Sequence, residues 1–141
     1  MKATIDWGGN VKFSALTETG HTIVMDGAPK HGGNNEGARP MELLLVGMGG
    51  CTGFDVVGIL KKARAELDSL QIQLEAERAD ATPAVFTRIH VHFVLTGKGL
   101  KPELVERAIN LSAEKYCSAS IMLGQTADIT HSFEIVEAGA A

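Results

Sequence analysis

The sequence predicts an α+β fold, and three observations lead to this class. Short strand patterns gather at the N-terminus, two helical stretches begin at Pro40 and Pro102, and strands of alternating hydrophobicity stand between and after the helices. Because strands and helices are grouped and do not strictly alternate, the pattern differs from that of a parallel α/β sheet. The 141 residues, 45% of them hydrophobic, suit a single domain over residues 1–141 with a real core.

The first quarter of the chain predicts three short strands separated by glycine-containing turns. These strands cover residues 3–7, 11–16 and 21–26. Residues 27–39 are rich in glycine and polar side chains, so we expect a flexible loop there. This loop lacks the Gly-Lys-Ser/Thr ending of a phosphate-binding loop, and no cofactor is expected.

A long helix is predicted from Pro40 to about Glu66, because proline loses nothing by lacking an N–H in the first turn. Its first half is apolar almost all round, which indicates burial on most sides. A membrane span is not expected, since Glu42, Asp55 and several glycines interrupt the apolar stretch. Each glycine costs roughly 1 kcal/mol relative to alanine, so we expect the glycines to permit a close helix–helix contact near Cys51.

The rest of the chain predicts two strands, a second helix and a last strand. They cover residues 70–77, 86–96, 102–117 and 127–136. A disordered tail is expected at residues 137–141. His90 and His92 share one face of their strand, but two imidazoles are too few for a zinc site, and no metal is expected.

The composition excludes several classes of partner. A net charge of −4, a pI of about 5.7 and few aromatic residues argue against nucleic acid and anionic membranes. The N-terminal residues contain no apolar signal core, so we expect a cytoplasmic protein. Thiols stay reduced in that compartment unless a reaction oxidises them, which makes a permanent disulfide less expected than a transient one.

Two cysteines, Cys51 and Cys117, fall in the two predicted helices with 65 residues between them. Each has a carboxylate one helical turn away, Asp55 after Cys51 and Glu114 before Cys117. The separation rules out a local Cys-x-x-Cys unit, so a reactive pair would have to be assembled by the fold. From these residues alone, two ordinary buried thiols remain the alternative.

Several segments resemble the OsmC/Ohr family. The segments 40–44 (PMELL), 49–51 (GGC) and 55–57 (DVV) resemble its first cysteine helix, and 112–118 (SAEKYCS) resembles its second. The amino-acid sequences of both segments are similar to those of the YhfA-like branch. The order of strands and helices extends the resemblance over nearly the whole chain.

The resemblance implies an OsmC-like fold, in which antiparallel sheets wrap around central helices in an intertwined homodimer. It also implies a thiol peroxidase that reduces organic hydroperoxides, with Cys51 as the peroxidatic thiol and Cys117 as the resolving thiol. An external dithiol would then reduce the disulfide between them, and in the Ohr branch this reductant is a dihydrolipoyl group. No nucleic acid and no membrane take part.

The charged residues around Cys51 differ from the pattern of the peroxidase branches. Those branches supply an arginine from an early hairpin and a glutamate directly after the helix-opening proline, where this chain has Met41. Glu42 lies about 180° from Cys51 on an ideal helix, so we expect it to favour the helix N-terminus or to pair with Arg39. Asp55 shares the face of Cys51, where a carboxylate opposes thiolate formation.

A cation must therefore activate Cys51. Within the chain we favour Arg39, and Arg88 is a weaker candidate. A cation from the second subunit is a further alternative. Without such activation the alternative function is a non-catalytic protein that binds a small apolar molecule on the same fold. A cysteine pKa well below 7 would favour catalysis, whereas one near or above 8.5 would favour binding.

Overall fold

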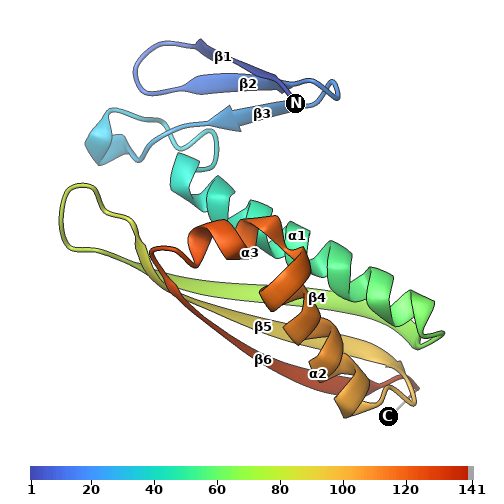
Figure 1. Ribbon diagram of the computed structural model, residues 1–141. Coiled ribbons are helices and arrows are strands. Elements are labelled where there is room, and N and C mark those ends of the chain that lie inside the picture. Colours follow the sequence, from blue (N-terminus) through green and yellow to red (C-terminus); the bar gives the residue numbers. More distant parts are fainter. Residues whose placement is uncertain (140–141) are drawn as a thin grey trace. The chain divides into compact units, whose positions relative to one another are not determined.

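The protein combines two three-stranded sheets with helices, which confirms the α+β class (Figure 1). The computed structural model describes residues 1–139. The chain divides into two compact units, residues 1–44 and residues 45 onward.

The first unit contains an antiparallel meander of three strands, as the sequence predicted. The strands are β1 (Ala3–Trp7), β2 (Phe13–Thr17) and β3 (Thr22–Met25). Gly9 and Gly20 have φ angles of 93° and 89° in the two connecting turns, a region that side chains with a Cβ rarely adopt.

One buried carboxylate organises the segment that follows β3. Asp26 is only 3% exposed, and its oxygens accept hydrogen bonds from the backbone N–H groups of Gly27, Asn34 and Glu36 at 2.8–3.1 Å. A short 3₁₀ turn, η1 (Pro29–His31), lies within this segment. Three N–H donors hold the Asp26 carboxylate in its ionised form, so they keep its pKa below the ordinary aspartate value.

The second unit is built on a sheet in the order β4-β5-β6, with helices on one face (Figure 1). The strands are β4 (Glu66–Arg78), β5 (Phe86–Lys98) and β6 (Asp128–Glu137). Helix α1 (Pro40–Lys62) precedes the sheet, and α2 (Pro102–Leu111) and α3 (Ser118–Leu123) connect β5 to β6. Alternate residues of β5 supply the centre of the core: Phe86, Ile89, Val91, Phe93 and Leu95.

One detail of the expected fold is corrected. β4 and β5 are antiparallel, but β6 runs parallel to β5. The physical reason is the helical connection between β5 and β6, which carries the chain back to the beginning of β5 before β6 starts. The second sheet is therefore mixed.

The sequence predicted that the glycines of α1 permit a close contact with another helix. Within this unit, Gly49 and Gly53 instead permit a close contact with strand β4. A Cβ added at Gly49 would lie 2.9 Å from a methyl group of Leu74, and one added at Gly53 would lie 2.7 Å from Ile72. Both leucine and isoleucine side chains belong to β4. α1 is long and apolar enough to cross a membrane by length and composition alone, and 33% of its apolar window is buried inside the structure.

The second predicted helix is interrupted, which is a further correction. α2 ends at Leu111, a wide π-helical turn covers Ser112–Tyr116 (η2), and Cys117 is extended with φ −80° and ψ 100° before α3 begins. Helical periodicity cannot distinguish a continuous helix from two helices joined by one wide turn.

The C-terminal tail begins later than expected. Glu137 is still part of β6, and the N–H of Ala138 donates to the carbonyl of Gly97. The last two positions of the predicted tail, 140 and 141, lie outside the described residues.

Candidate active site

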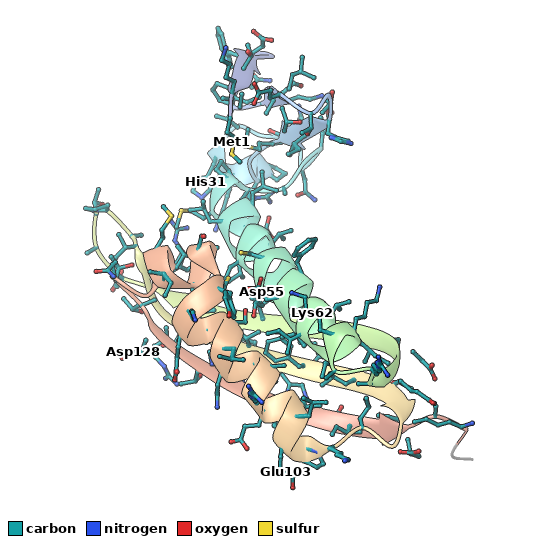
Figure 2. All side chains as sticks on the ribbon, turned by 45° about the vertical axis from the view of Figure 1, so that its right-hand side comes forward. Met1, His31, Asp55, Lys62, Glu103 and Asp128 are labelled. Carbon is teal, nitrogen blue, oxygen red and sulfur yellow. The ribbon has the colours of Figure 1, made fainter. Side chains whose placement is uncertain are left out.

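The fold brings Cys51, Asp55 and Cys117 together. One ligand atom from each, the two Sγ atoms and a carboxylate oxygen, all lie within 4.8 Å of one another. Cys51 and Asp55 are one turn apart on α1, and Cys117 directly precedes α3. In Figure 2 Asp55 is labelled between α1 and the α2–α3 segment. Two thiols with 65 residues between them in the sequence thus share one site.

The wide turn determines where the Cys117 side chain lies. The N–H of Cys117 donates to the carbonyl of Ser112 at 2.8 Å, a bond that spans five residues. Cys117 then serves as the N-cap of α3, where its Sγ accepts a hydrogen bond from the N–H of Ser120 at 3.3 Å. The cysteine therefore takes the capping position that serine or aspartate usually occupies.

A chain of buried hydroxyl groups joins the two halves of the site. Thr52 Oγ1 and Ser112 Oγ lie 2.8 Å apart, and Ser112 Oγ donates to Asp55 Oδ2 at 2.9 Å. Because the Ser112 hydroxyl has one proton and gives it to Asp55, Thr52 is the donor to Ser112. Sequence reasoning missed Thr52 and Ser112. The available signal was weak: two small hydroxyl residues inside the two cysteine segments.

The two thiols differ in exposure. Cys117 is completely buried, whereas Cys51 is partly exposed, and both are free thiols. Burial raises the pKa of the Cys117 thiol and outweighs the hydrogen bond from the backbone N–H of Ser120, which acts in the opposite direction. The neighbouring Cys51 raises the Cys117 pKa further.

The supporting residues proposed from sequence have other partners in the structure. Glu42 Oε1 accepts a hydrogen bond from the backbone N–H of Arg39 at 2.9 Å, which is the expected stabilisation of the helix N-terminus. The Arg39 guanidinium donates to Asn35 Oδ1 at 2.8 Å. Glu114 is exposed within the wide turn, because the interrupted helix no longer stacks it beside Cys117.

Two cavities lie in the second unit. An apolar groove of about 1010 Å³ follows α1 and β4 and includes Gly49, Gly53 and Phe54. A polar pocket of about 430 Å³ lies between the α2–α3 segment and β6, and its lining includes Ser120 and His131. Within residues 1–139, Ser120 Oγ and His131 Nε2 are buried without a hydrogen-bond partner. Neither cysteine lines either cavity.

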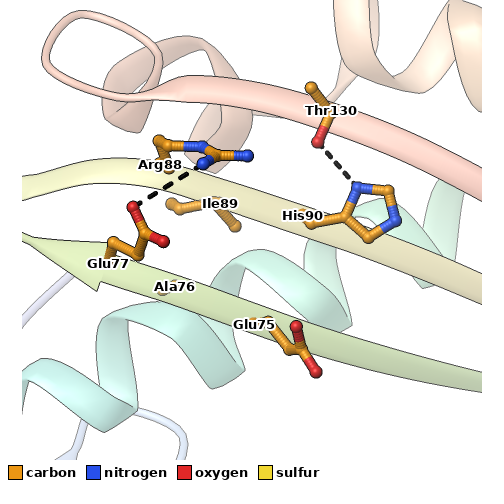
Figure 3. Close-up of a pocket in the computed structure, with 7 residues that line it drawn as sticks. All are labelled: Glu75, Ala76, Glu77, Arg88, Ile89, His90 and Thr130. Atoms are coloured by element: carbon orange, nitrogen blue, oxygen red, sulfur yellow. Dashed lines mark hydrogen bonds and ion pairs between the residues drawn. The ribbon is translucent and has the colours of Figure 1, made fainter.

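The outer face of the second sheet carries the two histidines noted in the sequence. His90 Nδ1 lies 2.6 Å from Thr130 Oγ1, and Ser132 Oγ lies within 2.8 Å of both His90 and His92. Figure 3 shows a shallow pocket on this face, with Arg88 paired to Glu77 at 3.8 Å. Arg88 therefore lies on the sheet face opposite the core residue Ile89 and does not approach Cys51 of its own chain.

The comparisons with known proteins are consistent over nearly the full length. The pattern of the family described as OsmC-like protein matches residues 32–132. Protein YhfA of Escherichia coli K12 is 41% identical over 138 residues, which cover 98% of this chain and 100% of YhfA. A hypothetical protein from Aquifex aeolicus has a solved structure with a TM-score of 0.84 and 31% identity, covering 96% of each chain.

A third match connects the fold to a named activity in another protein. An organic hydroperoxide resistance protein OsmC from Legionella pneumophila has a TM-score of 0.70, with 94% of this chain and 95% of that chain covered. At 17% identity this likeness shows the fold alone. The resemblance to the OsmC/Ohr family and the OsmC-like fold predicted from sequence are both confirmed.

Proposed function

The chain belongs to the OsmC-like protein family, and from that premise we propose that it is a thiol-dependent peroxidase that reduces organic hydroperoxides. The observation that carries this proposal is the proximity of the Cys51 and Cys117 sulfur atoms, which lie within 4.8 Å of each other. A disulfide has an S–S distance of about 2.0 Å, so the two sulfurs must move closer before they bond. The Legionella relative named as an organic hydroperoxide resistance protein shares the fold.

The exposures of the two thiols support the roles that we propose for them. Cys51 is the partly exposed sulfur, so it meets the hydroperoxide first, and buried Cys117 is protected from direct attack. The Cys51 thiolate attacks one peroxide oxygen, the O–O bond breaks, and the alcohol leaves with a proton while Cys51 becomes a sulfenic acid. The Cys117 sulfur then attacks the Cys51 sulfur, water leaves, and a disulfide forms.

An external dithiol completes the cycle by reducing the disulfide and becoming oxidised itself. A dihydrolipoyl group is the reductant that we propose. Arg39 is the cation that we propose to assist Cys51, because it directly precedes Pro40, the first residue of the helix that carries the thiol. Its substitution by alanine should lower the rate of thiol oxidation, whereas Lys30→Ala in the same segment should leave this rate unchanged.

The test follows two thiols through one turnover. Reduced protein is treated with an organic hydroperoxide, and intact mass and peptide mass are measured. We expect loss of two thiols and a Cys51–Cys117 linkage in the wild type, complete loss of peroxide consumption in Cys51→Ser, and a sulfenic acid without a disulfide in Cys117→Ser. If the wild-type protein keeps both thiols and shows no turnover with a dithiol, the proposal is wrong.

The polar pocket supports a second candidate, a non-catalytic protein that binds a small molecule. Two buried polar atoms without protein partners, on Ser120 and His131, are groups that a ligand can satisfy. Burial lowers the pKa of His131, so its imidazole is neutral near pH 7 and can donate or accept. Native mass spectrometry of protein taken directly from cells would detect such a ligand, and Ser120→Ala should weaken its retention.

We also propose that the working form is a cytoplasmic homodimer. Members of this family are generally homodimers. In the second unit Phe54 is 83% exposed and Val46 is 64% exposed beside the apolar groove, a degree of exposure that fits a surface covered by a second copy. Sedimentation velocity would measure the mass, and fractionation of cells would test the location.

A further inference from the structure

The proposed peroxidase chemistry needs two thiols, but the site contains a third ligand group. Asp55 presents a carboxylate oxygen within 4.8 Å of both sulfur atoms. Formation of a sulfur–sulfur bond has no use for this carboxylate. Two sulfurs and one carboxylate oxygen are, however, the donor types that bind Zn²⁺ in proteins.

The geometry of the three groups is close to what a tetrahedral cation requires. Bonds of about 2.3 Å to sulfur and about 2.0–2.2 Å to oxygen place neighbouring ligand atoms roughly 3.5 Å apart in a tetrahedral site. The three atoms here lie within 4.8 Å of one another, so each pair must close by at most about 1.3 Å to reach the tetrahedral spacing. Cys51 and Asp55 have the i, i+4 spacing that places both ligands on one helix face.

The surroundings of Asp55 match those of a metal-binding carboxylate. Ser112 Oγ donates to Asp55 Oδ2 at 2.9 Å, and Thr52 in turn holds Ser112. The carboxylate is thereby held in place, and its oxygens keep free lone pairs for a cation. Such outer hydrogen bonds orient ligating carboxylates in established metal sites.

We propose that the reduced protein binds one thiophilic divalent cation, Zn²⁺, through Cys51 Sγ, Asp55 and Cys117 Sγ, with water as the fourth ligand. On binding, the two S–H bonds break, two protons leave to solvent, and no atom changes oxidation state. Oxidation of the sulfurs to a disulfide removes both thiolate donors, so the metal-bound and disulfide states exclude each other. The inference rests on the geometry of these three groups and is independent of the peroxidase proposal.

The test measures metal binding directly. Reduced, chelator-treated protein is titrated with Zn²⁺ in competition with a chromogenic chelator, and Co²⁺ is used to record the absorption bands of tetrahedral thiolate coordination. We expect one ion per chain, loss of binding in Cys51→Ser and Cys117→Ser, and an affinity at least about 10-fold lower in Asp55→Asn. Asp80→Asn, which removes an exposed carboxylate in the β4–β5 turn, should bind like the wild type.

Two outcomes would overturn the inference. One is reduced wild-type protein that takes up no more Zn²⁺ than the double cysteine variant, and the other is equal affinity in Asp55→Asn and Asp80→Asn. Circular dichroism of each metal-free variant ensures that lost binding is not lost folding. Peroxide turnover measured in chelator tests the proposed function separately, so either proposal can fail while the other stands.

Discussion

Each of the two units of the chain is stabilised internally by a different kind of interaction. In residues 1–44 the buried positions are Asp26 and Gly33, whereas the buried hydrophobic side chains of the described residues all come from Met48 onward. The first unit is organised by hydrogen bonds to one carboxylate, and the second by a core that covers one face of β5. The candidate site belongs entirely to the second unit.

This difference indicates which unit can stand alone. The first unit leaves Ile5, Trp7 and Leu16 between 53% and 68% exposed, more than a small independent sheet can tolerate. A second copy of the chain would cover such residues, in line with the homodimers of the family. The second unit has its own apolar core around β5, but Phe54 and Val46 beside its groove are exposed as well.

Phe93→Ala should give the largest loss of stability. Phe93 is completely buried in the centre of β5, and its truncation should cost about 3–5 kcal/mol. The matched change Phe13→Ala, in the first unit where this side chain is 38% exposed, should cost less than about 1 kcal/mol. Equal shifts in urea unfolding midpoints would break the comparison.

Ser112→Ala should have the next largest effect, because it removes the hydroxyl that both Thr52 and Asp55 use. Leaving buried Thr52 and half-buried Asp55 without this partner should cost about 1–3 kcal/mol. Ser69→Ala, at an exposed position of β4, is the control and should leave the unfolding free energy nearly unchanged. A neutral Ser112→Ala would mean that the hydroxyl chain carries no stability.

Asp26→Asn should alter how stability depends on pH. Because the folded pKa of Asp26 lies below its ordinary value of 3.8, its ionisation contributes stability above about pH 3.8, and this contribution disappears as pH falls through the folded pKa. The variant should be less stable near pH 7 and lose less on acidification. Urea unfolding followed from pH 7 to pH 3 checks this, with Asp6→Asn, an exposed carboxylate, as the control.

Leu16→Ala should have the smallest effect on folding. Leu16 is 53% exposed in β2, so the change in unfolding free energy should stay within about 0.5 kcal/mol. The same change should weaken self-association if a second copy covers this strand, and sedimentation equilibrium would detect a shift toward monomer. Unchanged association would place the interface elsewhere.

The fold class and the strands followed from the sequence because alternating patterns and glycine turns are local signals. β1 was predicted at its observed bounds, and α1 was predicted to begin at its observed first residue, Pro40. The parallel pairing of β6 was not predictable, since pairing direction depends on the path of the connection and not on the strand's own residues.

The candidate site was predictable only in part. Cys51, Cys117 and Asp55 stood out by residue type and by the family resemblance, and these three meet in the structure. Glu114 was expected beside Cys117 from regular helical spacing, which the wide turn at Ser112–Tyr116 breaks. The hydrogen bond between Thr52 and Ser112 could not be predicted from sequence periodicity, because it forms only when the two helical segments pack together.

The wide turn before Cys117 makes the length of this segment matter more than its composition. An α-helix rotates about 100° per residue, so one residue removed from Ser112–Tyr116 would convert the turn into regular helix and swing the thiol to another side. Deletion of a single residue here would move the Cys117 thiol out of the site. Most substitutions at exposed Lys115 would leave the position of this thiol unchanged. The five residues Ser112–Tyr116 determine where the Cys117 side chain lies.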